Sequence, residues 1–565
     1  MEDISKMKRT IAIILSAVMV VMCCVLTACE VVEPVEVTSE NVWTLMDEYV
    51  NKIGYKNKEL VKGTIPEGGD SSGSGPDIMY ELPDITNYPV TVKGNGEVNV
   101  EIFVPTENNG SSIVKFIEQA ATQFNSAGVK VNGKTASVSI RTLEATLAED
   151  YILSGAYRPE GYIASNELYG ILMNENGIAA AKVSDKLVGN VMGIAIQKAK
   201  NDELKSAYSE VSIKTIVDAT KDGKLAVGYP NPTNNPTGLN FVISMLSYFD
   251  ANNPMSFEAT TDFSAFQSAV PLVSFSMDQM KQAANEGSIN AFVVEGQAFA
   301  ADSELSKNFV FMPFGVRHDN PLYAVGEVTS DENGVLQQFA EFTVGTDMQK
   351  YANELGFNAN DAYTSTVANY EGSLIKEVLE VWKNARVTSG KTSVVFVADV
   401  SGSMDGDKIE SLKQSLLNGM QYISEETRVG LITFESTVYV DVPIGEFNTE
   451  QQEYFAGAAE NLRANGGTST NNAILVASKI LHSEPEENKK LIIVLSDGQT
   501  GSGYSLSSVK SLIDNTEIPI YTIGYGNNAD EKELKEIANI NTGTYIKATS
   551  DNIGYLMKTI FNAEA

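Results

Sequence analysis

In the sequence VVFVADVSGSM, residues 394–404, an apolar run ends at Asp399 and two serines follow. A second apolar run, LIIVLSDG at residues 491–498, ends at Asp497. Continuous apolar runs of this length are typical of strands that are buried on both faces of a parallel sheet. Ligands of such sheets collect at the carboxyl ends of the strands, so these oxygen-bearing side chains predict a site for a hard divalent cation.

The order of elements beyond residue 404 supports a parallel sheet. Helical patterns at 407–423 and 449–462 alternate with apolar strand patterns at 428–436 and 518–526. Strands that alternate with amphipathic helices predict a sheet covered by helices on both faces. We therefore expect a doubly wound α/β domain in the C-terminal part of the chain.

This part of the chain, placed at residues 390–565, resembles a von Willebrand factor A domain. The metal-ion-dependent adhesion site of that family combines a DxSxS motif with a Thr from a second loop and an Asp from a third. Five positions of this sequence match it: Asp399, Ser401, Ser403, Thr468 and Asp497. The resemblance implies that the hydroxyl groups reach the ion directly or through water. It also implies that one coordination position accepts a carboxylate from a partner protein.

The chemistry of these side chains leads to the same cofactor. Mg²⁺ prefers near-octahedral oxygen ligation and gives up its waters reluctantly, so carboxylates and hydroxyls leave solvent positions that a ligand can take. We expect Mg²⁺, or another divalent cation, at this site. The alternative is that Ser401 and Ser403 only cap the following helix, because serine is a favoured capping residue. Helix capping does not require Thr468 or Asp497.

The N-terminus predicts export from the cytoplasm. Residues 1–28 combine a basic start, an apolar stretch and a cleavage site with small residues, as in a secretory signal peptide. The sequence Leu-Thr-Ala-Cys that ends at Cys29 resembles a bacterial lipobox, which implies cleavage before Cys29 and attachment of lipid to its thiol. We expect a protein on the extracytoplasmic face of the cell membrane, held by a lipid anchor. A retained spanning helix is the alternative, although the apolar run only approaches the roughly 20 residues that spanning requires.

Cysteine usage and charge narrow the function further. The three cysteines are Cys23, Cys24 and Cys29, so cleavage before the last leaves a single cysteine and no disulfide. The formal net charge of −32 argues against nucleic acid or an anionic membrane surface as partner, because both attract basic patches.

Residues 29–85 are predicted to form an N-terminal tether and a flexible linker. They contain one helical pattern, NVWTLMDEYVNKIG at residues 41–54, and a stretch rich in Gly, Ser and Pro at residues 65–77. The second composition is typical of a flexible linker. We expect this region to extend the folded domains away from the membrane.

Residues 86–385 are predicted to form a second α/β unit, and their length favours two lobes. The segments PEGYIASNELYGIL, KLAVGYPNPTNNPTGL, INAFVVEGQAF and FAEFTVGTDMQKYANELGF resemble type II solute-binding proteins of ABC importers, nearest to those that bind molybdate and related oxyanions. The resemblance implies a ligand held in a cleft between the lobes. The residues that it places there are Ser111, Ser112, Ser165, Thr237 and Glu295.

One loop departs from the oxyanion binders. After the second strand the sequence reads RTLEAT, with Leu143 and Glu144 where a turn rich in serine is expected. A carboxylate near an oxyanion is repulsive, which argues against molybdate, phosphate and sulfate. The unit therefore binds another solute or serves as a scaffold, and helix capping explains each of the Ser and Thr residues equally well.

No catalytic constellation can be assembled. The only histidines, His318 and His482, lie in different predicted domains. Neither can be combined with other residues into a Ser-His-Asp triad or a Cys-His pair. We expect a non-enzymatic, lipid-anchored surface protein that binds a protein partner through a Mg²⁺-dependent adhesion site and carries a solute-binding-like domain. The alternative is a solute receptor for an ABC importer or a sensor, with the A domain as an accessory module. A hydrolase ranks third.

Overall fold

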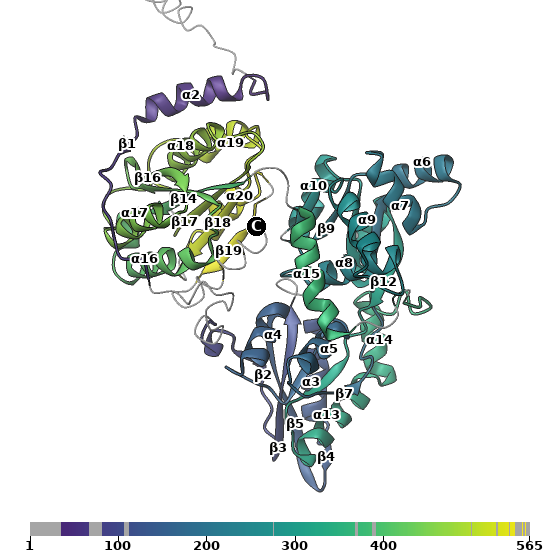
Figure 1. The fold of residues 1–565 in the computed structure, drawn as a ribbon. Helices are drawn as coiled ribbons and strands as arrows, with labels where there is room; N and C mark the ends of the chain where they lie inside the picture. Colours follow the sequence, from purple (N-terminus) through teal and green to yellow (C-terminus); the bar gives the residue numbers. More distant parts are fainter. Residues whose placement is uncertain are drawn as a thin grey trace, which may run out of the picture.

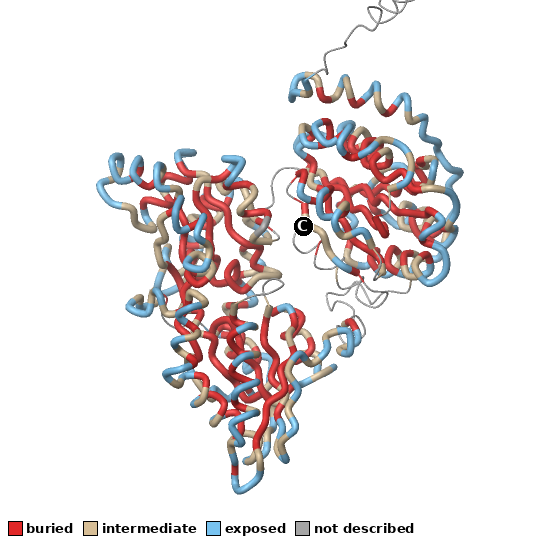
Figure 2. Tube along the Cα trace, turned by 180° about the vertical axis from the view of Figure 1, so that it is seen from behind, coloured by how far each residue is buried: buried red, intermediate tan, exposed pale blue. Residues whose placement is uncertain are grey.

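The computed structural model describes residues 36–66, 82–106, 112–274, 276–365, 367, 371–386, 391–498, 500–526, 529–541, 543–548, 556 and 560. The predicted signal peptide, Cys29 and Ser111 lie outside these residues. The chain forms two α/β units (Figure 1), one built from residues 82–386 and the other from the C-terminal part together with residues 36–66. Buried residues gather around the sheets of each unit (Figure 2).

The C-terminal unit is a seven-stranded sheet with the order β1-β16-β15-β14-β17-β18-β19. All neighbouring strands are parallel except the antiparallel pair β15 and β16. This arrangement confirms the predicted doubly wound α/β fold. The strands are β1 (Lys56–Asn57), β14 (Thr392–Asp399), β15 (Arg428–Phe434), β16 (Val438–Glu446), β17 (Lys489–Ser496), β18 (Ile520–Tyr525) and β19 (Tyr545–Ala548).

Helices cover both faces of this sheet because its central strand is apolar on both sides. In β14, Val394 and Phe396 belong to one buried cluster and Val395 and Val397 to the other, as alternating side chains of a strand require. Residues of α16 and α17 pack in the first cluster, and residues of α18, α19 and α20 in the second. The helices are α16 (Asp407–Gly419), α17 (Thr449–Glu460), α18 (Thr470–His482), α19 (Leu506–Asp514) and α20 (Glu531–Ala538).

Part of the predicted tether belongs to this C-terminal unit. Helix α2 (Val42–Ile53) packs on α18 and α19, and β1 extends the sheet beside β16 (Figure 1). The α2 side chains of Val42, Met46 and Val50 are buried, because they are four residues apart and share one helical face. Residues 42–57 are therefore docked on a folded unit, which corrects the expectation that this part of the tether is an extended spacer.

Residues 82–386 are called the inserted unit here, because in sequence they lie between residues 36–66 and the other strands of the C-terminal unit. The inserted unit has two sheets, as the predicted two-lobed architecture requires. The first lobe contains a seven-stranded sheet with the order β2-β5-β3-β6-β13-β7 and β4 beside β5. Its strands are β2 (Val90–Val92), β3 (Val98–Thr106), β4 (Lys130–Val131), β5 (Lys134–Glu144), β6 (Gly161–Ile163), β7 (Ala180–Ser184) and β13 (Leu322–Val325). Its helices are α3 (Ser112–Ser126), α4 (Ala145–Ser154), α5 (Leu168–Glu175), α13 (Ser330–Thr343) and α14 (Thr346–Glu354).

The second lobe contains a five-stranded sheet with the order β10-β9-β11-β8-β12. Its strands are β8 (Val191–Gln197), β9 (Val227–Pro230), β10 (Leu272–Ser274), β11 (Ala291–Glu295) and β12 (Phe309–Arg317). Its helices are α6 (Lys198–Tyr208), α7 (Ile213–Lys221), α8 (Pro236–Phe249), α9 (Phe257–Gln267), α10 (Met277–Glu286), α11 (Gly296–Ala301) and α12 (Ser303–Asn308). Helix α15 (Gly372–Arg386) packs on α5 of the first lobe and on α8 and α9 of the second, and so joins the lobes.

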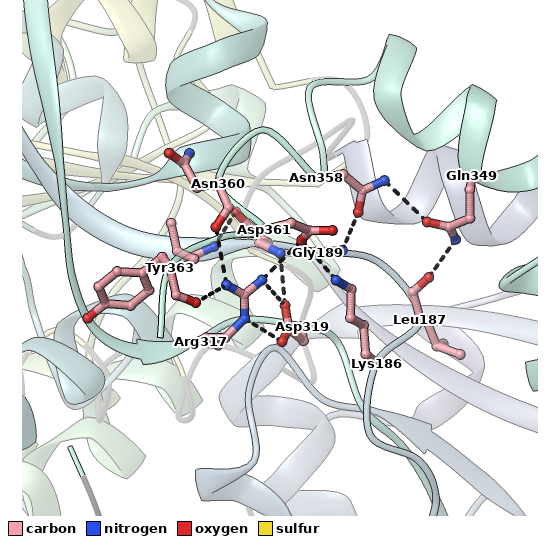
Figure 3. Close-up of polar contacts among 12 residues, drawn as sticks. Lys186, Leu187, Gly189, Arg317, Asp319, Gln349, Asn358, Asn360, Asp361 and Tyr363 are labelled. Carbon is pink, nitrogen blue, oxygen red and sulfur yellow. Dashed lines mark hydrogen bonds and ion pairs between the residues drawn. The ribbon is translucent and has the colours of Figure 1, made fainter. Parts of the chain in front are cut away.

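A polar network joins the two segments that cross between the lobes, residues 185–190 and 318–321 (Figure 3). Arg317 forms a bidentate ion pair with Asp319, at 2.6 and 2.8 Å. Its guanidinium also donates to the carbonyl oxygen of Tyr363, at 2.7 Å. These contacts hold the end of β12, the second crossing segment and residues 360–363 together.

Candidate metal-binding site

The predicted metal residues begin at the ends of two neighbouring strands. β14 and β17 are parallel, and Ala398 is in register with Leu495. Asp399 is the last residue of β14, and Asp497 directly follows β17. Because the parallel strands end at one edge of the sheet, the two carboxylates meet there, and both are fully buried.

Two hydrogen-bond donors and a second carboxylate lie beside Asp399. Its Oδ1 accepts from the backbone N–H of Ser401 at 2.8 Å, and its Oδ2 accepts from the hydroxyl of Ser496. Burial raises the pKa of Asp399 to about 6, and the hydrogen bonds from Ser401 and Ser496 oppose this shift. The nearby charge of Asp497 raises the pKa further. A bound cation would favour the ionised form of such a carboxyl group.

The second serine of the motif links the two strand ends. The hydroxyl of Ser403 lies 3.0 Å from that of Ser401 and donates to Oδ1 of Asp497 at 3.1 Å. Oδ2 of Asp497 accepts from the ammonium group of Lys408 at 2.9 Å. Four of the five predicted ligands thus form one hydrogen-bonded chain, and Lys408 supplies a positive charge beside it.

The fifth predicted ligand, Thr468, lies on a loop that contacts both the loop after Asp399 and the loop after Asp497. Gly402 donates its backbone N–H to the carbonyl oxygen of Gly466 at 3.1 Å. The carbonyl oxygen of Thr468 accepts from the backbone N–H groups of Gly501 and Ser502, at 3.0 and 2.9 Å. α18 begins two residues beyond Thr468, at Thr470. The three loops therefore meet at one edge of the sheet.

The donor set fits a hard cation. Among the described residues, no three His, Cys, Asp or Glu side chains gather closely enough to hold a metal ion by themselves. A site here has to use hydroxyl oxygens beside its two carboxylates, and oxygen-only ligation suits Mg²⁺. Two buried hydroxyls of the third loop, those of Thr500 and Ser502, have no hydrogen-bond partner among the described residues. These atoms add acceptor oxygen at the same edge.

A second polar cluster lies in the inserted unit around Glu295, the last residue of β11. The carboxylate of Glu295 contacts Nδ1 of His318 at 2.5 Å, the amide of Asn190 at 2.9 Å and the hydroxyl of Thr237 at 3.4 Å. His318 is fully buried. Its Nε2 lies 2.7 Å from the amide nitrogen of Asn240, so Nε2 accepts and Nδ1 carries the proton toward Glu295.

This cluster also links the lobes. The amide nitrogen of Asn166, which follows β6 of the first lobe, lies 3.2 Å from Nε2 of His318. The structure thus brings two predicted ligand residues, Thr237 and Glu295, together at the lobe boundary. Ser165 is buried next to Asn166, and Ser112 begins α3, but no described hydrogen bond joins either serine to Glu295.

Comparison with known proteins identifies the C-terminal unit. The family model described as the von Willebrand factor type A domain matches residues 393–561. This part of the chain is a von Willebrand factor type A (VWA) domain. The inter-alpha-trypsin inhibitor heavy chain H3 of Bos taurus is 32% identical over 166 residues, which cover 27% of this chain and 18% of that protein. The chain thus spans about a fifth of the length of this relative.

Solved structures similar to the inserted unit include two solute-binding proteins. A periplasmic thiamin binding protein is 10% identical, with a TM-score of 0.37. The match covers 52% of this chain and 98% of the thiamin binding protein. Iron-bound HitA from Pseudomonas aeruginosa is 12% identical, with a TM-score of 0.37. The match covers 51% of this chain and 100% of HitA.

Several residues of these sites were not singled out from the sequence. In the VWA domain they are Lys408, the second residue of α16, and Ser496, which directly precedes Asp497. A lysine just after a DxSxS motif and a hydroxyl beside the third-loop Asp are weak signals. His318 had been noted only as half of an incomplete catalytic set, yet it lies at the centre of the cluster between the lobes.

The helices of the structure can also be compared with the length that a membrane-spanning helix needs. Within the described ranges, no helix combines the length and the apolar character needed to cross a bilayer.

Proposed function

We propose that this protein binds a partner protein through a Mg²⁺-dependent adhesion site in its VWA domain, while a lipid on Cys29 holds it to the extracytoplasmic face of the cell membrane. The residues that would hold Mg²⁺, or another divalent cation, are Asp399, Ser401, Ser403, Thr468 and Asp497. The observation that carries the proposal is the meeting of three loops at the ends of β14 and β17, joined by hydrogen bonds from Ser401 to Asp497.

A bound divalent cation would supply electrostatic attraction for a carboxylate of the partner. The chain's own residues have distinct tasks in this proposal. Ser401 and Ser496 orient the carboxylate of Asp399 by donating to its two oxygens. Ser403 fixes Asp497 in the same way. Lys408 balances the charge of Asp497 and would be displaced or held aside when the cation binds.

The remaining features fit an interaction protein rather than an enzyme. His318 is enclosed by Glu295 and Asn240, and His482 stacks on Trp43. Neither imidazole is paired with a nucleophile in these contacts. The net charge of −32 disfavours nucleic acid as the partner.

The test is partner capture from native cells on the full chain, with and without chelator. We expect chelation or Asp399→Ala to abolish capture, because the buried carboxylate anchors the site, while circular dichroism stays unchanged. Asp407→Ala is the matched control, since Asp407 is an exposed acid in the first turn of α16. Capture that survives both chelator and Asp399→Ala refutes the proposal.

A second candidate function is reception of a small solute by residues 82–386, for an importer or a sensor. The contact of Asn166 in the first lobe with His318 in the segment that crosses between the lobes favours it, because a polar cluster at the lobe boundary could respond to a ligand. The test is thermal unfolding of the full chain against amino acids, sugars, metals and oxyanions. A stabilising compound whose effect is lost in Glu295→Gln supports this function, and no effect across the panel counts against it.

A further inference from the structure

Helix α2 packs on the two helices that follow the second and third metal loops. α18 begins two residues after Thr468, and α19 follows the loop that starts at Asp497. Val42, Met46 and Val50 of α2 share one buried cluster with residues of both helices. Residues 36–66 lie outside the range that matches the VWA family model. This docked helix is thus an addition to the VWA domain at the side of two metal loops.

Polar and aromatic contacts fix the position of α2 along α18. The rings of Trp43 and His482, at the end of α18, are stacked with centroids 3.8 Å apart. Asp47 forms an ion pair with Lys479 at 2.5 Å. These contacts set the register of the two helices, which the apolar face alone leaves free to slide.

One residue of α2 reaches the third metal loop itself. Tyr504 lies in the loop that connects Asp497 to α19. The centroid of the Tyr49 ring is 4.9 Å from the centroid of the Tyr504 ring. The backbone N–H of Tyr504 donates to the side chain of Asn472 at 2.9 Å, and its carbonyl oxygen accepts from Asn471 at 3.1 Å. Both asparagines lie in the first turn of α18, directly after the second metal loop.

We propose that α2 is a positioning element of the metal site: through Tyr49 and Tyr504 it holds the loops of Thr468 and Asp497 in their cation-binding arrangement. This inference rests on the proposed function. It predicts that a segment more than 400 residues before the loops of Thr468 and Asp497 in sequence sets the cation affinity of the VWA domain. Mutations along packed contacts that lead to a binding site change its coupling by about 2- to 30-fold in affinity.

The experiment compares the full chain with Tyr49→Ala by calorimetric titration of Mg²⁺ and Mn²⁺ and by amide hydrogen exchange. Tyr49 is only partly buried, so its truncation should leave the domain folded. We expect a loss of cation affinity of about 2- to 30-fold. Exchange should become faster at the amides of Gly501, Ser502 and Tyr504, which now donate hydrogen bonds across the loops.

Two controls separate positioning from general stability. Glu48→Ala changes an exposed neighbour on the same helix, and Phe455→Leu weakens the core on the opposite face of the sheet. Neither should alter cation affinity. Unchanged exchange in Tyr49→Ala, or faster exchange with unchanged affinity, overturns the proposal. If the wild-type chain binds neither ion, the proposed function fails, and the exchange rates alone decide whether α2 positions the loops.

Discussion

Replacing Lys58 by Met should destabilise the C-terminal unit, although Lys58 lies more than 300 residues before its partners Thr433 and Asp441 in sequence. The ammonium group of Lys58 lies 2.6 Å from Oδ1 of Asp441 and 3.1 Å from the hydroxyl of Thr433. Asp441 is buried in the sheet, with 4% of its side chain exposed. The substitution leaves this carboxylate without its cationic partner.

The exposure of the two side chains bounds the size of the effect. Breaking a fully buried ion pair costs about 3–5 kcal/mol, and an exposed pair is worth about 0–1 kcal/mol. The Lys58 side chain is 42% exposed, so we expect a loss of about 2 kcal/mol in the free energy of unfolding. In a unit of this size that corresponds to a fall of about 4–8 °C in the unfolding temperature.

The dependence on pH provides a second signature. Burial raises the pKa of Asp441, and the charge of Lys58 opposes that shift. Without Lys58 the folded-state pKa rises further above the ordinary value of 3.8, so the neutral form is favoured in the folded protein. The stability lost in the variant should therefore be largest at pH 8 and should shrink as the pH falls towards 5.

The assay is differential scanning calorimetry of the full chain at both pH values. Lys56→Met is the matched control, because Lys56 is an exposed lysine of β1, two residues before Lys58, and pairs through its backbone with Tyr439. Adding Asp441→Asn to Lys58→Met should recover part of the loss. Equal unfolding temperatures for wild type and Lys58→Met at pH 8 would refute the reasoning.

Three further changes test other parts of the structure. Arg317→Met removes the bidentate pair with Asp319 and should lower the unfolding free energy of the inserted unit by about 3 kcal/mol, seen in calorimetry as a shift of its transition alone. Gly457→Ala should destabilise the C-terminal unit by about 1–3 kcal/mol, because a Cβ there would lie 2.0 Å from the carbonyl oxygen of Val61; an unchanged unfolding temperature would contradict that contact. Burial raises the pKa of Glu149 well above its ordinary value of 4.5. The stability of the wild type should therefore fall as the pH rises above 4.5, because folding then disfavours the ionised carboxylate. Glu149→Gln should flatten this pH dependence, which urea titrations between pH 5 and 8 measure.

Much of the VWA domain could be read from the sequence because its signals are local. Apolar strands ending at Asp399 and Asp497 fixed the parallel sheet, and the DxSxS spacing fixed two of the serines beside them. The structure then supplied the partners, such as Ser496 and Lys408. These depend on where a side chain points after folding, which spacing alone does not give.

The role of residues 36–66 had only a partial signal in the sequence. The α2 pattern predicted a helix, but nothing in it says which surface its apolar face covers. β1 has only two residues, Lys56 and Asn57, both exposed, so it lacks the apolar alternation by which a strand is recognised. Its backbone pairs with an open sheet edge, and that edge exists only once β16 has formed.

The α/β class, the two units and the oxygen-rich strand ends follow from the amino-acid sequence, because apolar periodicity and short motifs act over a few residues. The docking of residues 36–66 on the VWA unit, and the contact of His318 with Glu295 at the lobe boundary, follow only from the folded chain. Such contacts join residues far apart in the chain. They depend on complementary shape and charge between surfaces that do not exist until each element has folded.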